Sequence, residues 1–336
     1  MGKLTYPIIY ITISALLGAS LSYIFFKKTL GAVTENVAHT NSSSSCNYTQ
    51  SKLDGFPHVK PVLLADQDCE SIKLNPLKNN LKSLIEAEQA KGSVLSASVY
   101  IRDLAGDDWI SVFGNEKYHP ASMNKVGVLI TFLHAAESYP NLLDQKLTFE
   151  KHDASLPEQY YTSKGLQPGT EYSVKDLLHY MIAYSDNEAT QLLLGHIDAN
   201  FYAKTFTDLG LPKPSAIFDD SKVTAKEYSV FMRVLYNASY LSIPASEFAI
   251  KLLTECDFKE GLLKTLPKEL QVSHKFGECR TDNTYELHES GIVYLSNKPY
   301  LITIMTKGTE RKPLSDIIGA ISGMVYNNFN TTVAAL

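Results

Sequence analysis

Ser122 and Lys125 stand three positions apart, where an apolar segment begins. On a helix this spacing puts both side chains on one face, one turn apart. A serine hydroxyl is a weak nucleophile until a base takes its proton, and a lysine that its neighbours keep partly neutral can be that base. The helix N-terminus also offers backbone N–H groups to a developing oxyanion. The pair therefore indicates acyl transfer, whereas the alternative is an ordinary surface pair.

Two further motifs follow in chain order. Residues 185–187, Ser-Asp-Asn, end one predicted helix and open the next, and residues 275–277, Lys-Phe-Gly, close a predicted strand. Taken singly, the first is typical of a helix cap and the second of a strand end. Together and in this order, the three motifs resemble the S-x-x-K, S-D-N and K-T-G set of class A β-lactamases and penicillin-recognising enzymes. The resemblance covers about residues 75–326.

The resemblance implies an α/β (α+β) fold, in which an antiparallel five-stranded sheet is flanked by helices beside an all-helical subdomain. In the family the site lies between the two parts. By the same resemblance, Ser122 is expected to be the acylated nucleophile and Lys125 its base. Ser185 is expected to relay a proton to the leaving nitrogen.

The substrate-binding residues are also carried over from the resemblance. Asn187 is expected to hold Lys125 and the substrate amide, and Lys275 to face a substrate carboxylate. Gly277 completes the third motif. The backbone N–H groups of Ser122 and Glu278 are expected to form the oxyanion hole. No metal or cofactor is expected.

The chain departs from the family where class A β-lactamases carry a loop with a deacylating glutamate. Residues 213–222 run almost directly into a helix that starts near Thr224, which leaves no room for that loop. Asp219 and Asp220 are the nearby carboxylates, and they are expected to form a turn and a helix start. Glu227 is expected on the outer face of the helix.

A second departure is Phe276, where the family has threonine or serine, so a hydroxyl for a substrate carboxylate is missing. Arg280, Thr281 or Lys275 could supply that recognition instead. The histidines near the predicted strand ends, His274 and His288, are interpreted as structural.

Three functions follow from these residues. The first is a hydrolase that cleaves a β-lactam amide or a D-Ala-D-Ala-like peptide, with a possible place in antibiotic resistance. The second is a penicillin sensor or receptor that is acylated and deacylates slowly, and the third is an esterase or amidase that acts on another substrate.

The predicted elements follow the order that such a fold needs. A helix at 76–91 has leucines and an isoleucine at helical spacing, and the runs 95–104 and 109–113 around a turn predict a hairpin. Helical patterns then dominate to about residue 253, for example at 174–184, 187–194 and 225–236. Strand patterns return at 271–275, 291–295 and 300–306, before a final helix at 313–324. These patterns predict a sheet built from both ends of the domain, with a helical insertion at about 126–255.

The N-terminus predicts a membrane anchor at 1–28. Residues 7–26 are an uncharged run of 20 residues, which suits a hydrocarbon core of about 30 Å. A cleaved signal is the alternative. A polar linker at 29–75 and a catalytic domain at 76–336 are expected to follow. Flanking charges barely decide the orientation, so the expected extracytoplasmic location of the domain rests on its function.

Composition narrows the partners. The net charge is -5, with 44% hydrophobic and 20% charged residues, which is typical of a globular domain and argues against nucleic-acid binding. The expected partner is a small-molecule or cell-wall peptide substrate. Four cysteines lack the spacing of a zinc site. They allow three disulfide connectivities, of which 46–69 with 256–279 joins nearest neighbours, and buried thiols are the alternative.

Overall fold

The computed structural model describes residues 46–156, 159–214, 221–281, 283–296 and 298–334. Residues from Asn47 onward form one compact unit. The predicted membrane segment, 7–26, lies outside the described residues. Among the helices of the described ranges, none is both long and apolar enough to span a bilayer.

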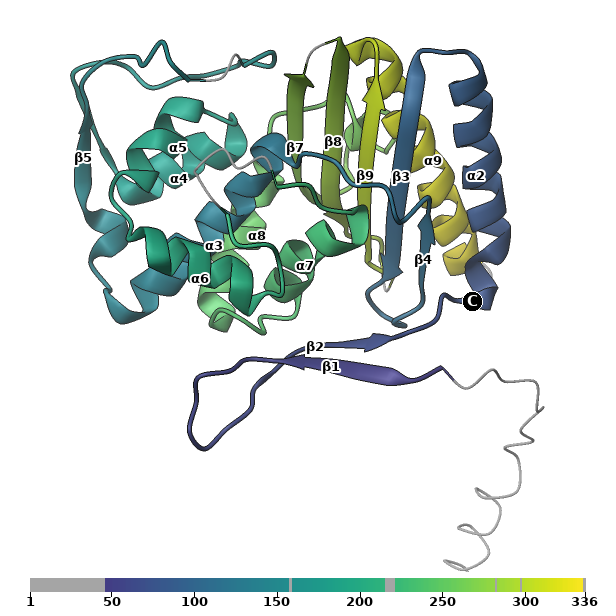
Figure 1. The fold of residues 1–336 in the computed structure, drawn as a ribbon, viewed down its shortest axis with the longest axis horizontal. Coiled ribbons are helices and arrows are strands. Elements are labelled where there is room, and N and C mark those ends of the chain that lie inside the picture. Colours follow the sequence, from purple (N-terminus) through teal and green to yellow (C-terminus); the bar gives the residue numbers. More distant parts are fainter. Residues whose placement is uncertain (1–45, 157–158, 215–220, 282, 297, 335–336) are drawn as a thin grey trace, which may run out of the picture. The chain divides into compact units, whose positions relative to one another are not determined.

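A five-stranded antiparallel sheet forms the centre of the unit, with strand order β4-β3-β9-β8-β7 (Figure 1). Its first two strands come from the start of the domain and the other three from the end, as the sequence predicts. The central pairing joins Ile101 to Ile302, and both side chains are buried. The strands are β3 (Val94–Asp103), β4 (Trp109–Val112), β7 (Val272–Thr281), β8 (Thr284–Val293) and β9 (Tyr300–Gly308).

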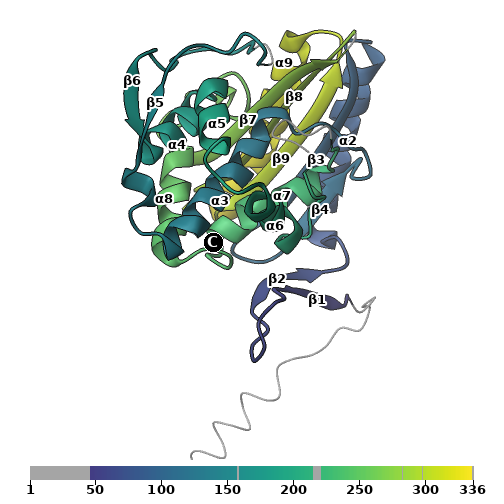
Figure 2. The same cartoon turned by 60° about the vertical axis from the view of Figure 1, so that its left-hand side comes forward.

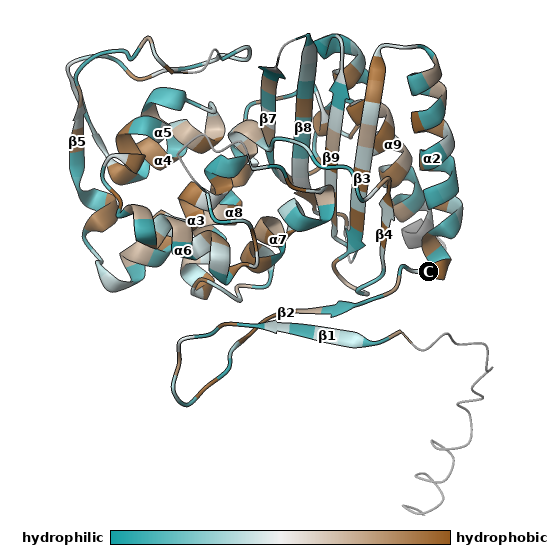
Figure 3. Ribbon diagram, viewed as in Figure 1, coloured by the Kyte–Doolittle hydropathy of each residue, from teal (hydrophilic) through white to brown (hydrophobic). Residues whose placement is uncertain are grey.

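Two helices cover one face of the sheet, α2 (Asn75–Ala90) and α9 (Arg311–Ala334). Leu77, Leu81 and Ile85 of α2 are buried because their four-residue spacing puts them on one side of the helix. The visible side of α2 in Figure 3 is largely hydrophilic. The helix α9 continues beyond the predicted 313–324, since the ring of Phe329 stacks on Tyr300 of β9.

The helical region occupies the middle of the sequence, and α3 (Lys125–Ser138) contacts several of its other helices (Figure 2). Nearly every residue in the first ten of α3 is buried. Side-chain caps start the neighbouring helices: Ser173 and Thr224 form capping boxes, and Asp186 and Asp198 accept backbone N–H bonds. These helices are α4 (Val174–Ala183), α5 (Asn187–Leu194), α6 (Ala199–Asp208), α7 (Ala225–Tyr236) and α8 (Ile243–Thr254).

Two small hairpins were not expected from the sequence. One pairs β5 (Lys146–Phe149) with β6 (Thr170–Ser173) inside the helical region. The other pairs β1 (Tyr48–Lys52) with β2 (Val62–Gln67), so the expectation of a plain polar linker over 29–75 does not hold there. Leu63 and Leu64 of β2 are buried in the main core, which explains why this segment is ordered onto the domain. The short 3-10 helices are η1 (Ile72–Leu74), η2 (Ala121–Asn124), η3 (Leu142–Asp144) and η4 (Leu262–Lys264).

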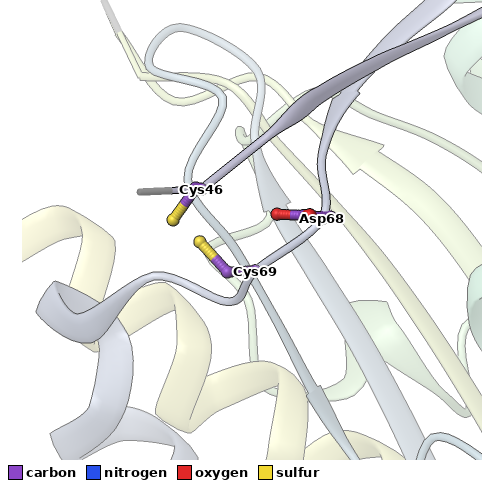
Figure 4. A group of neighbouring side chains, drawn as sticks. All are labelled: Cys46, Asp68 and Cys69. Carbon is purple, nitrogen blue, oxygen red and sulfur yellow. The ribbon is translucent and has the colours of Figure 1, made fainter. Parts of the chain in front are cut away.

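The cysteines divide into two kinds. Cys46 and Cys69 are disulfide-bonded, and Figure 4 shows their sulfur atoms facing each other beside Asp68. Because a disulfide has no thiolate to offer, the grouping of these three side chains is no metal site. Cys256 and Cys279 do not form the second predicted disulfide and are thiols in the structure.

Asp66 of β2 ties the hairpin to the body through two buried arginines. Its carboxylate accepts hydrogen bonds from Arg102 of β3 at 2.8 Å and from Arg233 of α7 at 2.6 and 3.0 Å. The two arginine side chains are only 4% and 3% exposed. Removing their shared partner leaves buried positive charge without compensation.

We therefore expect Asp66→Ala to lower the free energy of unfolding by about 3–5 kcal/mol, because breaking a buried ion pair costs about that much. Chemical denaturation followed by circular dichroism measures the change. Asp54→Ala is the matched control, since Asp54 pairs with Lys60 in solvent, and it is expected to leave the midpoint unchanged. An equal midpoint for both variants contradicts the structural role of Asp66.

Candidate active site

Ser122 lies on η2, and the chain passes from η2 directly into α3 at Lys125. The nucleophile is half-buried, and Lys125 follows one turn later, as predicted. Ala121, the residue before the serine, has φ of 49°. A non-glycine residue in this left-handed region is strained, and the surrounding contacts must hold it there. We call residues 119–124 the nucleophile turn.

Two long-range hydrogen bonds hold the nucleophile turn. Oε2 of the buried Glu286, on β8, accepts the His119 N–H at 3.0 Å. The hydroxyl of the buried Tyr228, on α7, donates to the Met123 carbonyl at 2.8 Å. The sequence analysis singled out neither residue, because nothing in their local pattern announces a contact more than 100 residues away.

A third constraint is the close approach of β7. The edge strand passes the turn at Gly277, and a Cβ placed there would lie 2.9 Å from the Met123 nitrogen and closer still to the Pro120 carbonyl oxygen. Both atoms belong to the backbone of the nucleophile turn. Only glycine allows this approach, which explains the third residue of the Lys-Phe-Gly motif.

Lys125 is the centre of the hydrogen-bond network. Its side chain is buried, and Nζ donates to Oδ1 of Asn187 at 2.7 Å, to Oγ of Ser185 at 3.2 Å and to the Ser185 carbonyl. Ser185 has φ of 57°, which turns the chain between α4 and α5 and brings both groups to the lysine. Burial, and then the nearby ammonium of Lys275, lower the pKa of Lys125 well below its ordinary value. A neutral amine in this position can accept the proton of Ser122.

Lys275 approaches the same hydroxyl from β7. Its Nζ donates to Oγ of Ser185 at 2.9 Å and to the Phe276 carbonyl at 3.1 Å. Burial lowers the pKa of Lys275 to about 8. The Ser185 hydroxyl therefore lies between two lysines, which suits a group that passes a proton on.

Asp186 positions the start of α5 and was not given a role by the sequence. Its Oδ1 accepts the Ala189 N–H at 2.7 Å, and its Oδ2 accepts the Leu166 N–H at 3.2 Å. Burial raises the pKa of this carboxyl. By capping α5, Asp186 fixes the neighbouring Asn187 toward Lys125.

Glu278 follows Gly277 on the edge strand, where every second backbone N–H lacks a ladder partner. Its side chain leads away from the turn, to Nε of Arg311 and the Tyr285 hydroxyl, both at 3.0 Å. The role of the Ser122 and Glu278 N–H groups as an oxyanion hole stays a prediction, and the proximity of β7 to η2 is compatible with it.

The carboxylates considered as hydrolytic bases divide as follows. Asp219 and Asp220 lie outside the described residues. Glu227 caps α7: Oε2 accepts the Thr224 N–H at 2.7 Å. Its other oxygen faces Lys117 in solvent. Glu227 is therefore engaged at the helix surface, as expected.

The two histidines left out of the predicted site have buried carboxylate partners. His274 Nδ1 is 2.6 Å from Glu289, and His288 Nε2 is 3.3 Å from Glu286. Burial opposes the charged form of His274, but the neighbouring Cys256 and Glu289 raise its pKa to about 10. These contacts link β7, β8 and the nucleophile turn, which fits their structural interpretation.

Solved structures share this architecture. PBP-A is similar, with 20% sequence identity, a TM-score of 0.64 and an alignment that covers 77% of this chain and 97% of that chain. A variant of PBP-A in an acyl-enzyme complex with penicillin G is 21% identical, with the same TM-score and coverage. The TLA-3 extended-spectrum β-lactamase is 18% identical, with a TM-score of 0.65 and coverage of 75% and 98%. At these identities the likeness establishes the fold.

A further similar structure is a β-lactamase from Chitinophaga pinensis, which is 19% identical, with a TM-score of 0.63 and coverage of 76% and 99%. No curated protein matches the chain. The profile of the beta-lactamase enzyme family matches residues 76–329. This range contains the sheet, the helical region and all three motifs, so the chain belongs to the beta-lactamase enzyme family.

Proposed function

We propose that the protein is a serine acyl-hydrolase that cleaves a β-lactam amide or a D-Ala-D-Ala-like peptide through an acyl-enzyme on Ser122. The observation that carries this proposal is the state of Lys125. It is buried beside Ser185 and Asn187, and its pKa is lowered by burial and by Lys275. A lysine with these neighbours is suited to be a general base for the serine one turn before it.

The reaction proceeds in balanced steps. Oγ of Ser122 attacks the substrate carbonyl carbon, and its proton passes to Nζ of Lys125. The Ser185 hydroxyl gives its proton to the leaving nitrogen and receives one from Lys125. The carbon–nitrogen bond then breaks and leaves an ester on Ser122. Water cleaves that ester in the second half of the reaction.

The other motif residues stabilise the reacting groups. Asn187 orients Lys125 and offers its amide to the substrate. The charge of Lys275 lowers the energy of an anion that develops on Ser185. Backbone N–H groups of Ser122 and Glu278 would receive the tetrahedral oxyanion, and removing one such donor typically costs about 10²–10³ in rate.

Ser122→Ala tests the proposal directly. We expect the full-length protein in detergent to release product from a chromogenic cephalosporin or from a D-Ala-D-Ala peptide, and the variant to release none above buffer, because the acyl group has no acceptor. Absorbance and D-alanine release are the two measurements. Equal release by both proteins, or no release from either substrate by the wild type, contradicts the hydrolase.

A slow acyl-enzyme is the second candidate function, that of a penicillin sensor. It is favoured by the carboxylates of the described part of the site, since Asp186 caps α5 and Glu286 holds the His119 N–H. Neither is available to activate a hydrolytic water. Mass spectrometry of the protein after brief exposure to penicillin separates the candidates: an adduct that lasts for hours favours the sensor, and rapid return to the free mass favours the hydrolase.

The location of the domain is part of the proposal. An anchor at 1–28 would hold the domain outside the cytoplasm, where cell-wall peptides and β-lactams are met. The uncharged run at 7–26 supports this location.

A further inference from the structure

Three aromatic side chains surround the position after Lys275, and we call Tyr161, Phe258 and Phe276 the aromatic cluster. The rings of Phe258 and Phe276 stack with their centroids 4.2 Å apart and their planes at 15°. Tyr161 meets each of them edge-on at 5.2 Å. Phe258 and Phe276 are 0% and 1% exposed. The cluster is therefore a packed, dry feature beside the site.

The cluster joins segments that are distant in sequence. Phe276 lies on β7 and Phe258 follows α8, whereas Tyr161 lies on the connection from β5 to β6. The Tyr161 hydroxyl donates to the Asp257 carbonyl at 3.0 Å, which fixes its ring. Tyr160 on the same connection packs against Tyr285 of β8 at 5.2 Å. Two aromatic contacts thus hold this connection over the edge of the sheet.

The aromatic cluster encloses the ammonium of Lys275. Nζ lies 4.1 Å from the centroid of the Phe276 ring, and its hydrogen bonds go to Ser185 and to the Phe276 carbonyl. The side chain is fully buried. The charge is therefore compensated by the protein itself, through a ring face and two oxygen acceptors.

The other cations near the described part of the site are engaged or distant from it. Lys125 donates to Ser185 and Asn187. Arg311 pairs with Glu278 and Glu260. Arg280 is exposed to water, which screens its attraction for an anion.

Penicillins and D-Ala-terminated peptides carry a carboxylate beside the scissile amide, and burying that anion without a cation is costly. We infer that the site prefers acyl donors with a neutral group at this place, such as esters or amides, and that Phe276 is the residue that determines this specificity. A threonine or serine would offer a hydroxyl and space, whereas the phenylalanine ring offers neither. This inference rests on the proposed acylation of Ser122.

A matched pair of reagents tests the preference. Benzylpenicillin and its methyl ester share the reactive ring and differ only in the carboxylate. The rate of Ser122 adduct formation on the full-length protein is measured by mass spectrometry, and each rate is divided by the reagent's own alkaline hydrolysis rate. We expect the methyl ester to react about tenfold faster or more, since an unpaired buried charge costs at least that much.

Variants assign the preference to the ring. Phe276→Thr is expected to lower the ester-to-acid ratio at least about tenfold, because a hydroxyl that hydrogen-bonds a charged group contributes about 1.5–3 kcal/mol, and 1.4 kcal/mol is a factor of 10. Phe276→Leu, which keeps an apolar side chain, is expected to retain the wild-type ratio. If Phe276→Thr does not fold, Tyr161→Ala opens the cluster from its half-buried side and is expected to lower the ratio in the same direction.

The outcomes are distinct. A wild-type adduct that forms faster from the acid than from the ester overturns the inference and leaves the proposed function standing. Reaction with the methyl ester and with p-nitrophenyl butyrate, but not with the acid, supports it. No Ser122 adduct from any of the three reagents overturns the proposed function itself. A ratio that falls equally in Phe276→Thr and Phe276→Leu shows that packing, and not the hydroxyl, sets the preference, and this also overturns the role of Phe276.

Discussion

Lys125→Met is expected to slow acylation of Ser122 by about 10²–10⁴, the usual contribution of a positioned general base. Methionine keeps the length and the apolar stem of the side chain but cannot accept a proton. The lysine donates to Asn187 and to two oxygens of Ser185, so its loss also leaves buried acceptors unsatisfied, at about 1–3 kcal/mol each. Stopped-flow labelling with a fluorescent penicillin measures the rate.

The control for this variant is Lys91→Met at the exposed end of α2, where Lys91 pairs with Glu88 in solvent. It is expected to label at the wild-type rate. Thermal unfolding of Lys125→Met identifies any loss that comes from stability alone. Wild-type labelling by a folded Lys125→Met protein contradicts the assignment of Lys125 as the base.

The pH dependence of acylation gives an independent test of the same pair of lysines. Lys125 acts as a base only when neutral, so the rate rises as pH rises through its lowered pKa. Lys275 acts only when charged, and its pKa is about 8, so the rate falls as pH passes that value. We expect a bell-shaped profile for the free enzyme, with the falling limb near pH 8. A rate that climbs steadily to pH 10 contradicts the lowered pKa of both lysines.

Much of the fold could be predicted from hydrophobic periodicity, since the helices α5 and α7 begin and end where the sequence pattern does. The strand β8 could not. Its pattern predicted a strand at 291–295, whereas β8 begins at Thr284. Its first half carries Glu286, His288 and Glu289, which read as a surface segment. They are buried because each meets a partner from another element, and a local pattern does not contain those partners.

The hairpins were missed for a different reason. The strand β1 is exposed throughout, and β5 and β6 have four residues each, so neither pair shows a clear apolar alternation. Asp66 illustrates the difficulty. It reads as a polar linker residue, but two buried arginines from β3 and α7 bind it.

The candidate site was predicted better than its supports. The residue types of the three motifs predict a nucleophile, a base and a relay, and the structure brings Lys125, Ser185, Asn187 and Lys275 into one network. The residues that hold the nucleophile turn were not found. Glu286 acts through a backbone N–H of residue 119, a contact that depends on the register of β8 and not on any local motif.

Gly277 combines fold and site in one atom-level constraint. It lies where the edge strand β7 passes the nucleophile turn. A Cβ at this position would meet the Met123 nitrogen at 2.9 Å and Cγ of Met123 at 3.0 Å, in addition to the Pro120 carbonyl oxygen. A side chain could rotate away, but two of these three atoms are backbone. Either β7 or the turn must therefore move to admit a methyl group.

Gly277→Ala is accordingly expected to lower the free energy of unfolding by about 1–3 kcal/mol, as overpacking does. It is also expected to slow acylation of Ser122 about 10²-fold, because a displacement of about 1 Å at the reacting atoms costs that much. Gly195→Ala is the matched control, since its φ is -66° and its Cβ would find atoms only at 3.6 Å. Denaturation and fluorescent-penicillin labelling measure both effects. If Gly277→Ala labels as fast as Gly195→Ala, β7 does not set the position of the nucleophile.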